Sequence, residues 1–333
     1  MKTEVVVITG ASAGVGRATA VAFAKRGARV GLIARGLERL EAAKREIEGL
    51  GSRAVSLQAD IADAPQVEAA ADAAERQLGP IDIWVNNAMA TIFSPFLEIT
   101  PEEFRRATEV TYLGCVHGTM AALRRMKPRN RGMIVQVGSA LAYRSIPLQS
   151  PYCGAKHAIV GFTDSLRSEL IHDGTDVYLT VVHLPAMNTP QFEWSRTRLP
   201  NQPQPVPPIY QPEVGAEAIV WAAHHRRREV DVGFPTVLAL AGQKLAPGIA
   251  DRYLAATGYE SQQAEDAVLP DRADNLFTPV PGNYGAHGRF SAEARRSSAQ
   301  FWVNRNLSLL GLAAGAATAF GLIAFGGGLN RRG

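Results

Sequence analysis

Tyr152 and Lys156 lie four positions apart in Pro151–His172, a stretch with the apolar spacing of a helix. Residues four apart share one face of a helix, so the phenol and the ammonium are expected to be neighbours. A free tyrosine titrates near ~10, and a nearby positive charge favours the phenolate and lowers its pKa. The pair therefore predicts a general acid and base that works near neutral pH, the alternative being two side chains that only cover a helix face.

Ser139 strengthens this interpretation because it follows a predicted strand, Met133–Val137, thirteen positions before Tyr152. In an open α/β sheet, ligands bind at the carboxyl ends of the strands. A hydroxyl at such an end is expected to face the same crevice as Tyr152.

A second group of residues has the spacing of a phosphate-binding turn. Gly10, Ser12, Gly14, Val15 and Gly16 follow the first predicted strand and open the first predicted helix. Glycine lets a pyrophosphate approach the backbone, and the helix N-terminus offers N–H groups and partial positive charge. The pattern predicts a dinucleotide site, the alternative being a plain structural turn.

The end of the second predicted strand indicates which dinucleotide binds. NAD-binding proteins usually carry an acidic residue there, whereas this chain has Arg35, and Arg17 and Arg39 are expected nearby. An arginine pairs with a 2′-phosphate through charge-assisted hydrogen bonds, so NADP(H) is favoured. The alternative is that Arg35 is a solvated surface charge.

The elements that must position these residues alternate between strands and helices through residue 235. The predicted strands are Val5–Thr9, Arg29–Ala34, Ala54–Gln58, Ile81–Asn86, Met133–Val137, Val177–His183 and Glu229–Val232. The predicted helices are Val15–Arg26, Leu37–Leu50, Gln66–Leu78, Pro101–Met126 and Pro151–His172. This alternation predicts an α/β fold, a Rossmann-type doubly wound parallel sheet with helices on both faces, in a domain of residues 1–240.

Taken together, residues 3 to about 235 resemble the short-chain dehydrogenase/reductase family. The matching motifs are Thr9–Gly16, Asp60-Ile61, Asn86-Asn87-Ala88, Ser139, Tyr152-x-x-x-Lys156 and Pro185 to Thr189.

The resemblance implies a role for each of these positions. Asp60 and Ile61 would meet the adenine, and Asn87 and Ala88 would line the cofactor crevice. Ser139 would bind the substrate oxygen, Tyr152 would exchange its proton, and Lys156 would hold the nicotinamide ribose. Thr189, after Pro185, would help to fix the carboxamide and phosphates.

The chain departs from the family pattern at three positions. Met89 and Ala186 stand where glycine is usual, and Thr111 occupies the position of the fourth catalytic residue, an asparagine that supports a water relay behind the lysine. Ser139, Tyr152 and Lys156 are intact.

The segment Met187–Pro212 follows the sixth strand and is expected to cover the substrate. Its large apolar residues favour a hydrophobic substrate, the alternative being that they pack this segment onto the domain. They are Phe192, Trp194, Leu199, Val206, Ile209 and Tyr210.

Beyond the core, residues 241–304 are predicted to be an irregular extension punctuated by proline and glycine. Residues 305–330 are predicted to form a hydrophobic helix, because 307–329 carries no charged residue and fits the length of a membrane span. The segment predicts a membrane anchor that leaves the catalytic domain in the cytosol. A buried or oligomer-covering helix and a disordered tail are the alternatives.

Composition sets the remaining expectations. Apolar residues make up 46% of the chain and charged residues 20%, with a net charge of +4, so no nucleic-acid partner is expected. The cysteine and histidine spacing predicts no metal site.

The function these features predict is an NADP(H)-dependent oxidoreductase that acts on a hydrophobic carbonyl or alcohol. An NADP(H)-binding redox sensor or scaffold, and another reaction on the same fold, are the alternatives. The resemblance also implies a homodimer or homotetramer, paired through Pro101–Met126 and Pro151–His172.

Overall fold

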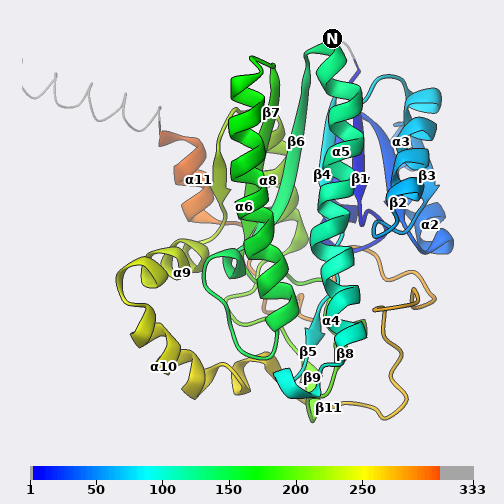
Figure 1. Cartoon of the computed structure of the whole chain (residues 1–333). Coiled ribbons are helices and arrows are strands. Elements are labelled where there is room, and N and C mark those ends of the chain that lie inside the picture. Colours follow the sequence, from blue (N-terminus) through cyan, green and yellow to red (C-terminus); the bar gives the residue numbers. More distant parts are fainter. Residues whose placement is uncertain (1–2, 308–333) are drawn as a thin grey trace, which may run out of the picture.

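A seven-stranded parallel sheet forms the centre of the protein, as seen in a computed structural model that describes residues 3–307 (Figure 1). Its strand order is β10-β7-β6-β4-β1-β2-β3, and each neighbouring pair runs parallel. The strands are β1 (Val5–Thr9), β2 (Arg29–Ala34), β3 (Ala54–Gln58), β4 (Ile83–Asn86), β6 (Gly132–Ser139), β7 (Val177–Leu184) and β10 (Glu229–Asp231). The order of the strands reverses between β1 and β4, where open α/β sheets bind their ligands.

Helices cover both faces of the sheet, which confirms the predicted doubly wound α/β fold. On one face, α1 (Gly14–Ala24), α2 (Leu37–Gly49) and α8 (Pro212–Ala223) share a hydrophobic core with the strands. On the other face lie α3 (Ala64–Leu78), α5 (Gly114–Met126) and α6 (Ser150–His172). Strand β1 shows why the sheet needs both layers. Val6 and Ile8 belong to the first core, and Val5 and Val7 belong to the second.

The predicted helix Pro101–Met126 is a continuous helical rod with a change of pitch in the middle. It consists of α4 (Pro101–Thr108), a π-helical turn (Glu109–Leu113) and α5. Thr100 caps the start by accepting a hydrogen bond from the backbone N–H of Glu103, whose carboxylate accepts one from the N–H of Thr100. The widened turn holds Thr111, one of the predicted site residues.

The extension is less irregular than its sequence suggested. It contains α10 (Pro247–Thr257), β11 (Gln263–Ala267) and α11 (Ala299–Arg305), and α9 (Phe234–Leu245) runs into it from the core. Pro235 and Pro247 lie in the first turns of α9 and α10. A proline fits the first turn of a helix, because the N–H that it lacks has no partner there. These prolines therefore mark the starts of helices, and Pro247 does so within the extension that was predicted to be irregular.

Residues 268–298 have no regular helix or strand, as predicted, and they pack against the core. Leu276 is fully buried among residues of the second core, and Phe290 joins a small cluster with Phe93 and Phe192. Strand β11 pairs antiparallel with β9 (Asn201–Pro203), and β5 (Ile92–Phe93) pairs with β8 (Arg196–Thr197). The extension is thus held against the segment that was expected to cover the substrate.

Within residues 3–307, every helix is too short or too polar to cross a membrane. The predicted anchor, 307–329, lies outside the described residues except for Leu307 at its start.

Candidate active site

One cavity of about 430 Å³ lies along the carboxyl ends of β1, β2, β4, β6 and β7. Gly10, Ser12, Gly14 and Val15 line one end, and Ser139, Tyr152 and Lys156 line the other. The cavity therefore brings together two groups of predicted site residues that lie well over 100 positions apart in the chain.

The glycine turn fits the close approach of a pyrophosphate. Gly10 has a φ of +66°, a conformation that favours glycine. A Cβ on Gly16 would lie 2.2 Å from the carbonyl oxygen of Gly10 and 2.5 Å from Nδ2 of Asn87, so no larger residue fits there. The side-chain amide of Asn87 donates to the carbonyl oxygens of Thr9 (3.0 Å) and Gly10 (3.3 Å). Asn87 thus holds the shape of the turn.

Three more of the predicted cofactor-site residues border the cavity, just beyond the ends of β3 and β4. Asp60, Ile61 and Ala88 line the cavity. The Asp60 carboxylate accepts a hydrogen bond from the backbone N–H of Ala62 (3.0 Å) and is paired with Arg106. These contacts fix the end of β3 where an adenine ring would lie.

Arg35 lines the same end of the cavity, and its guanidinium donates to three backbone carbonyls of the extension. The acceptors are the oxygens of Asn275, Leu276 (3.3 Å) and Phe277 (2.9 Å). Burial, followed by the charge of Arg106, lowers the pKa of Arg35. Arg35 is therefore an anchored group and not the solvated surface charge weighed as its alternative.

Arg17 and Arg39 are engaged as well. Nε of Arg17 pairs with Glu46 at 2.7 Å. The Arg39 guanidinium lies 4.9 Å from the centre of the Trp194 ring and 5.9 Å from that of Tyr284. Arg39 borders the cavity, whereas Arg17 lies beside it in α1.

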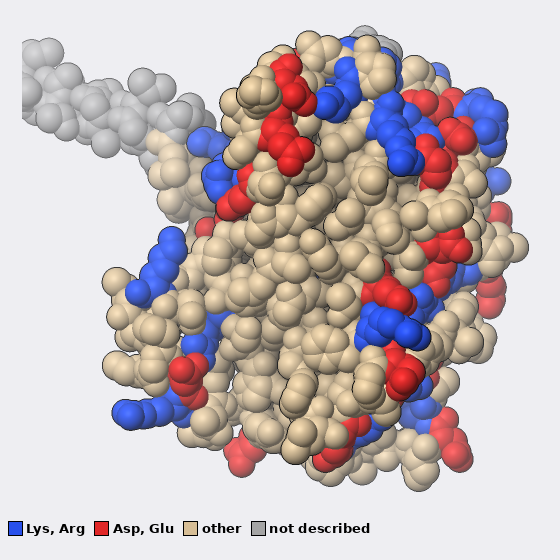
Figure 2. Space-filling view, viewed as in Figure 1, with Lys and Arg blue, Asp and Glu red and all other residues tan. Residues whose placement is uncertain are grey.

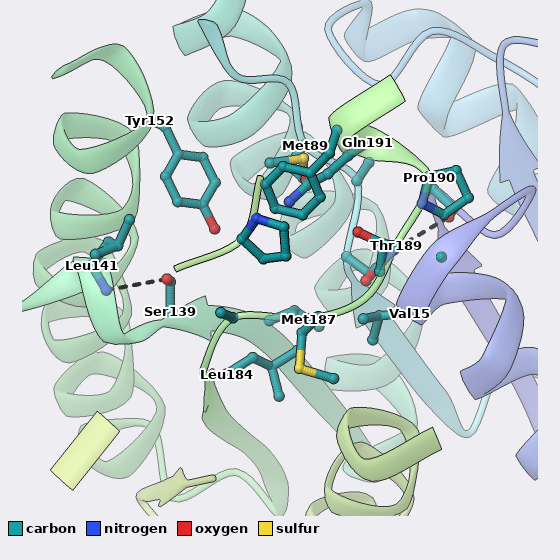
Figure 3. Close-up of a pocket in the computed structure, with 18 of the residues that line it drawn as sticks. Val15, Met89, Ser139, Leu141, Tyr152, Leu184, Met187, Thr189, Pro190 and Gln191 are labelled. Carbon is teal, nitrogen blue, oxygen red and sulfur yellow. Dashed lines mark hydrogen bonds between the residues drawn. The ribbon is translucent and has the colours of Figure 1, made fainter. Parts of the chain in front are cut away.

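At the other end, the Tyr152 hydroxyl points into the cavity on the side of the Ser139 hydroxyl (Figure 3). Ser139 is the last residue of β6, and its Oγ accepts a hydrogen bond from the backbone N–H of Leu141 at 3.1 Å. Nζ of Lys156, one turn along α6, lies 5.4 Å from the centre of the Tyr152 ring. Strand β6 and helix α6 thus converge to place a hydroxyl, a phenol and an ammonium around one space.

Burial dominates the electrostatics of this end. It raises the pKa of Tyr152 to about 12, although a hydrogen bond with Ser139 acts in the opposite direction. It lowers the pKa of Lys156 to about 8. The pKa of Tyr152 was expected to be lowered by Lys156. In the structure it is raised instead, because the effect of burial is larger.

Thr111 does not lie on the cavity. Its buried hydroxyl donates to the carbonyl oxygen of Ala90 at 2.9 Å and accepts from the Ala90 N–H at 3.0 Å. The residue ties the π-helical turn to the loop after β4, which carries Asn87, Ala88 and Met89. Its position indicates support of that loop, and its hydroxyl does not face the Tyr152 end of the cavity.

The loop after β7 closes the cavity between its two ends. Pro185, Ala186 and Thr189 line it, and Thr189 approaches Gly14 so closely that a Cβ there would meet its methyl group at 3.2 Å. Ala186 takes part through its backbone, because its carbonyl oxygen accepts from the N–H of Tyr210 at 2.9 Å.

The apolar residues of the covering segment divide into two groups. Phe192, Trp194 and Val206 line the cavity. Leu199 and Ile209 are buried in the small cluster around Phe93, and Tyr210 belongs to the first core. The segment therefore packs on the domain, as one interpretation expected, and also gives the cavity an apolar wall.

Several wall residues were not predicted from the sequence. Those from α9, α10 and the extension are Pro235, Ala239, Leu254, Gly258, Ser261, Gln262, Asn275 and Pro279. They match no motif, and contacts between distant parts of the chain bring them to the cavity, such as the pairing of β11 with β9 and the hydrogen bond that Gln149 donates to Gln262. Within residues 3–307, no group of three or more His, Cys, Asp or Glu side chains is arranged to hold a metal ion.

The chain is similar in sequence to known oxidoreductases. Residues 4–199 match the family model described as short chain dehydrogenase. The chain is 35% identical over 280 residues to the uncharacterised oxidoreductase YxnA of Bacillus subtilis (strain 168), which covers 83% of this chain and 78% of that protein. It is 32% identical over 299 residues to the uncharacterised oxidoreductase Mb1570 of Mycobacterium bovis, covering 85% and 84%. It is 34% identical over 192 residues to the 3-dehydrosphinganine reductase of Danio rerio, covering 56% and 57%.

Proposed function

This chain belongs to the short-chain dehydrogenase/reductase family and is an oxidoreductase, and from that premise we propose that it uses NADP(H) to interconvert a hydrophobic ketone or aldehyde and its alcohol. The observation that carries the proposal is the single cavity that joins the glycine turn to Ser139 and Tyr152. A nicotinamide cofactor stretched along this cavity would bring its reactive ring to the two hydroxyls.

The residues present fit such a cofactor. The glycine turn and Thr189 would hold the pyrophosphate, Asp60 and Ile61 would border the adenine, and Arg35 would pair with a 2′-phosphate. When bound, the nicotinamide supplies or accepts the hydride.

Tyr152 is the proton donor in the reducing direction and the acceptor in the oxidising direction. Its hydroxyl faces the cavity beside Ser139, so both hydroxyls reach one oxygen atom of a substrate. Ser139 donates a hydrogen bond to that oxygen and fixes its position. Because burial keeps Tyr152 protonated, the phenol is ready to donate to an oxygen that gains negative charge during reduction.

Lys156 keeps a positive charge behind the phenol. Its ammonium is 3% exposed and donates to the carbonyl oxygen of Val137 at 2.6 Å. A charge held there stabilises the phenolate that forms when Tyr152 gives up its proton, and the remaining N–H groups are free to bind a cofactor ribose.

The apolar wall supports a hydrophobic substrate. Leu141, Ile146, Met187, Phe192 and Val206 line the cavity that Tyr152 faces. One relative is named a 3-dehydrosphinganine reductase, which is in keeping with a ketone substrate for this chain as well.

The experiment that tests the function follows NADPH consumption against a panel of hydrophobic ketones and aldehydes. The transferred hydride is traced from cofactor deuterated at C4 into the product. Deuterium in an alcohol product is the expected result. Tight NADPH binding without any turnover across the panel favours the alternative, an NADP(H)-binding sensor or scaffold.

We also propose that the chain pairs with a second copy through the α4–α5 rod and α6. Figure 2 shows a broad face without Lys, Arg, Asp or Glu over α5 and α6. Met120 of α5 is an exposed apolar residue, 48% accessible. An uncharged helical face of this kind suits a symmetric contact between two copies.

A further inference from the structure

A segment outside the residues matched by the family model lies in the candidate cofactor site. Residues 275–285, here termed the strap, follow β11 in the extension and are drawn in orange at the lower right of Figure 1. Asn275 and Pro279 line the cavity. The strap is held in place by contacts with the very elements that were assigned to the cofactor.

At the end of the cavity near the glycine turn, the strap accepts a hydrogen bond from a backbone N–H group of that turn. The backbone N–H of Gly14 donates to the carbonyl oxygen of Gly285 at 3.1 Å. Nη1 of Arg17, one turn along α1, donates to Oδ1 of Asn283 at 2.5 Å. An oxygen atom of the strap therefore lies at the N-terminus of α1, where a phosphate oxygen would bind.

At the end of the cavity where the adenosine ribose would lie, the strap is hydrogen-bonded to Arg35. Three backbone carbonyls, at residues 275 to 277, accept from its guanidinium. Tyr284 packs edge-on against Trp194, with ring centres 4.7 Å apart, and Arg39 lies against both rings. The strap is anchored between these contacts by Leu276, which is fully buried.

We propose that the strap is a surrogate ligand, whose carbonyl oxygens hold the phosphate-binding groups until NADP(H) displaces them. The inference rests on the proposed function, because it concerns the same cofactor. Neutral carbonyls form weaker hydrogen bonds with a guanidinium than a phosphate does, so a 2′-phosphate competes successfully for Arg35. The strap closes the site in the free protein and gives way to the phosphates.

The two ends of the strap then affect cofactor choice differently. Both NADPH and NADH carry a pyrophosphate, so the contact between Gly285 and Gly14 weakens the binding of both cofactors. Only NADPH carries a 2′-phosphate, so the contacts of residues 275–277 with Arg35 weaken the binding of NADPH alone. The strap therefore reduces the preference for NADPH that Arg35 would otherwise give.

The first test uses Gly285→Ala, with Gly174→Ala as its matched control. Both glycines have positive φ, +67° and +61°, and a Cβ at either meets nothing within 4 Å. Each substitution adds the same backbone strain, but only the first strains the strap. Calorimetric titration of the full chain is expected to give dissociation constants for NADPH and NADH about fivefold lower in Gly285→Ala, and unchanged in Gly174→Ala.

The second test loosens the other end with Leu276→Ala. The dissociation constant for NADPH is expected to fall severalfold further than that for NADH. Chymotrypsin, which cleaves after Phe277 and Tyr284, is expected to cut the wild-type strap faster when NADPH is present.

Several results would overturn the inference. Weaker NADPH binding in Gly285→Ala, or protection of the strap from chymotrypsin by NADPH, would make the strap a cover that retains the cofactor. Tight and equal NADPH binding in all variants would reject the surrogate ligand and leave the proposed function standing. No cofactor binding in any variant would reject both, whereas binding that appears only in Gly285→Ala would support both.

Discussion

The ammonium of Lys156 donates to the carbonyl oxygen of Val137 at 2.6 Å, which joins helix α6 to strand β6 directly behind the candidate site. Ser139 lies two residues beyond Val137, and Tyr152 lies one turn before Lys156. The contact therefore fixes the two elements that carry the hydroxyl and the phenol. It also compensates in part for burying a positive charge, which by itself is unfavourable.

Buried Lys156 should give the stability of the free protein a recognisable pH dependence. Burial lowers its pKa from 10.5 to about 8, so between these pH values the unfolded chain binds more protons than the folded one. Stability contributed by this residue therefore rises with pH over that window. Relative to Lys156→Met, the wild-type free energy of unfolding is expected to rise by up to about 3 kcal/mol from pH 8 to pH 10.5.

Urea unfolding at a series of pH values measures this difference. Lys25→Met, at an exposed position after α1, is the control. Its free energy of unfolding, plotted against pH, should run parallel to that of the wild type. A Lys156→Met curve that also runs parallel to the wild type would contradict the assigned direction of the pKa.

Thr111 is predicted to act through the loop after β4. Thr111→Val keeps the shape of the side chain but leaves the buried N–H and carbonyl of Ala90 without the hydroxyl, at a cost of about 2 kcal/mol in the free energy of unfolding. Thr111→Ser keeps the hydroxyl, so its free energy of unfolding should fall much less than that of Thr111→Val. Equal stability of the two variants in chemical denaturation would show that the contact with Ala90 contributes little.

Arg35 is predicted to separate the two cofactors. Arg35→Ala removes the partner of a 2′-phosphate, and the dissociation constant for NADPH is expected to rise by roughly tenfold or more. NADH binding should be unchanged or tighter, because Arg35 also holds residues 275–277. Arg26→Ala, at an exposed position on the connection between α1 and β2, serves as the charge-matched control. Equal losses for both cofactors in Arg35→Ala would argue against a 2′-phosphate site.

The core and both ends of the site could be predicted from the sequence because their signals are local. Strands β1, β2 and β3 have the predicted bounds, since each is an apolar run that ends at a turn. Ser139, Tyr152 and Lys156 follow from spacing on one strand and one helix. The position of Arg35 at the end of β2 also follows from the alternation of strands and helices.

The contribution of the extension to the candidate site could not be predicted, because it depends on contacts between distant parts of the chain. The carbonyls that hold Arg35 lie about 240 positions away, and backbone carbonyls carry no sequence signal. The same is true of Gly285, whose oxygen reaches Gly14. The raised pKa of Tyr152 depends on how deeply the fold buries it, which residue spacing does not reveal.

The segment 307–329 is predicted to anchor the protein to a membrane, with the catalytic domain in the cytosol. Its uncharged length fits a membrane span, and its alanines and glycines make its insertion marginal. Full-length protein is expected in the membrane fraction after cell lysis, and a chain that ends at residue 306 in the soluble fraction. Identical partitioning of the two proteins would count against the anchor.

We propose above all that Tyr152 exchanges a proton with the substrate oxygen while a hydride moves. The most direct measurement is NADPH oxidation by Tyr152→Phe on a substrate that the wild type reduces, with NADPH binding measured on the same sample. Tyr143→Phe is the matched control, since it removes a hydroxyl bonded to Glu229 at 2.5 Å, away from the cavity wall. Tyr152→Phe is expected to bind NADPH normally and to lose at least about a hundredfold in turnover, whereas Tyr143→Phe is expected to remain active. Near-normal turnover in Tyr152→Phe would contradict this proposal.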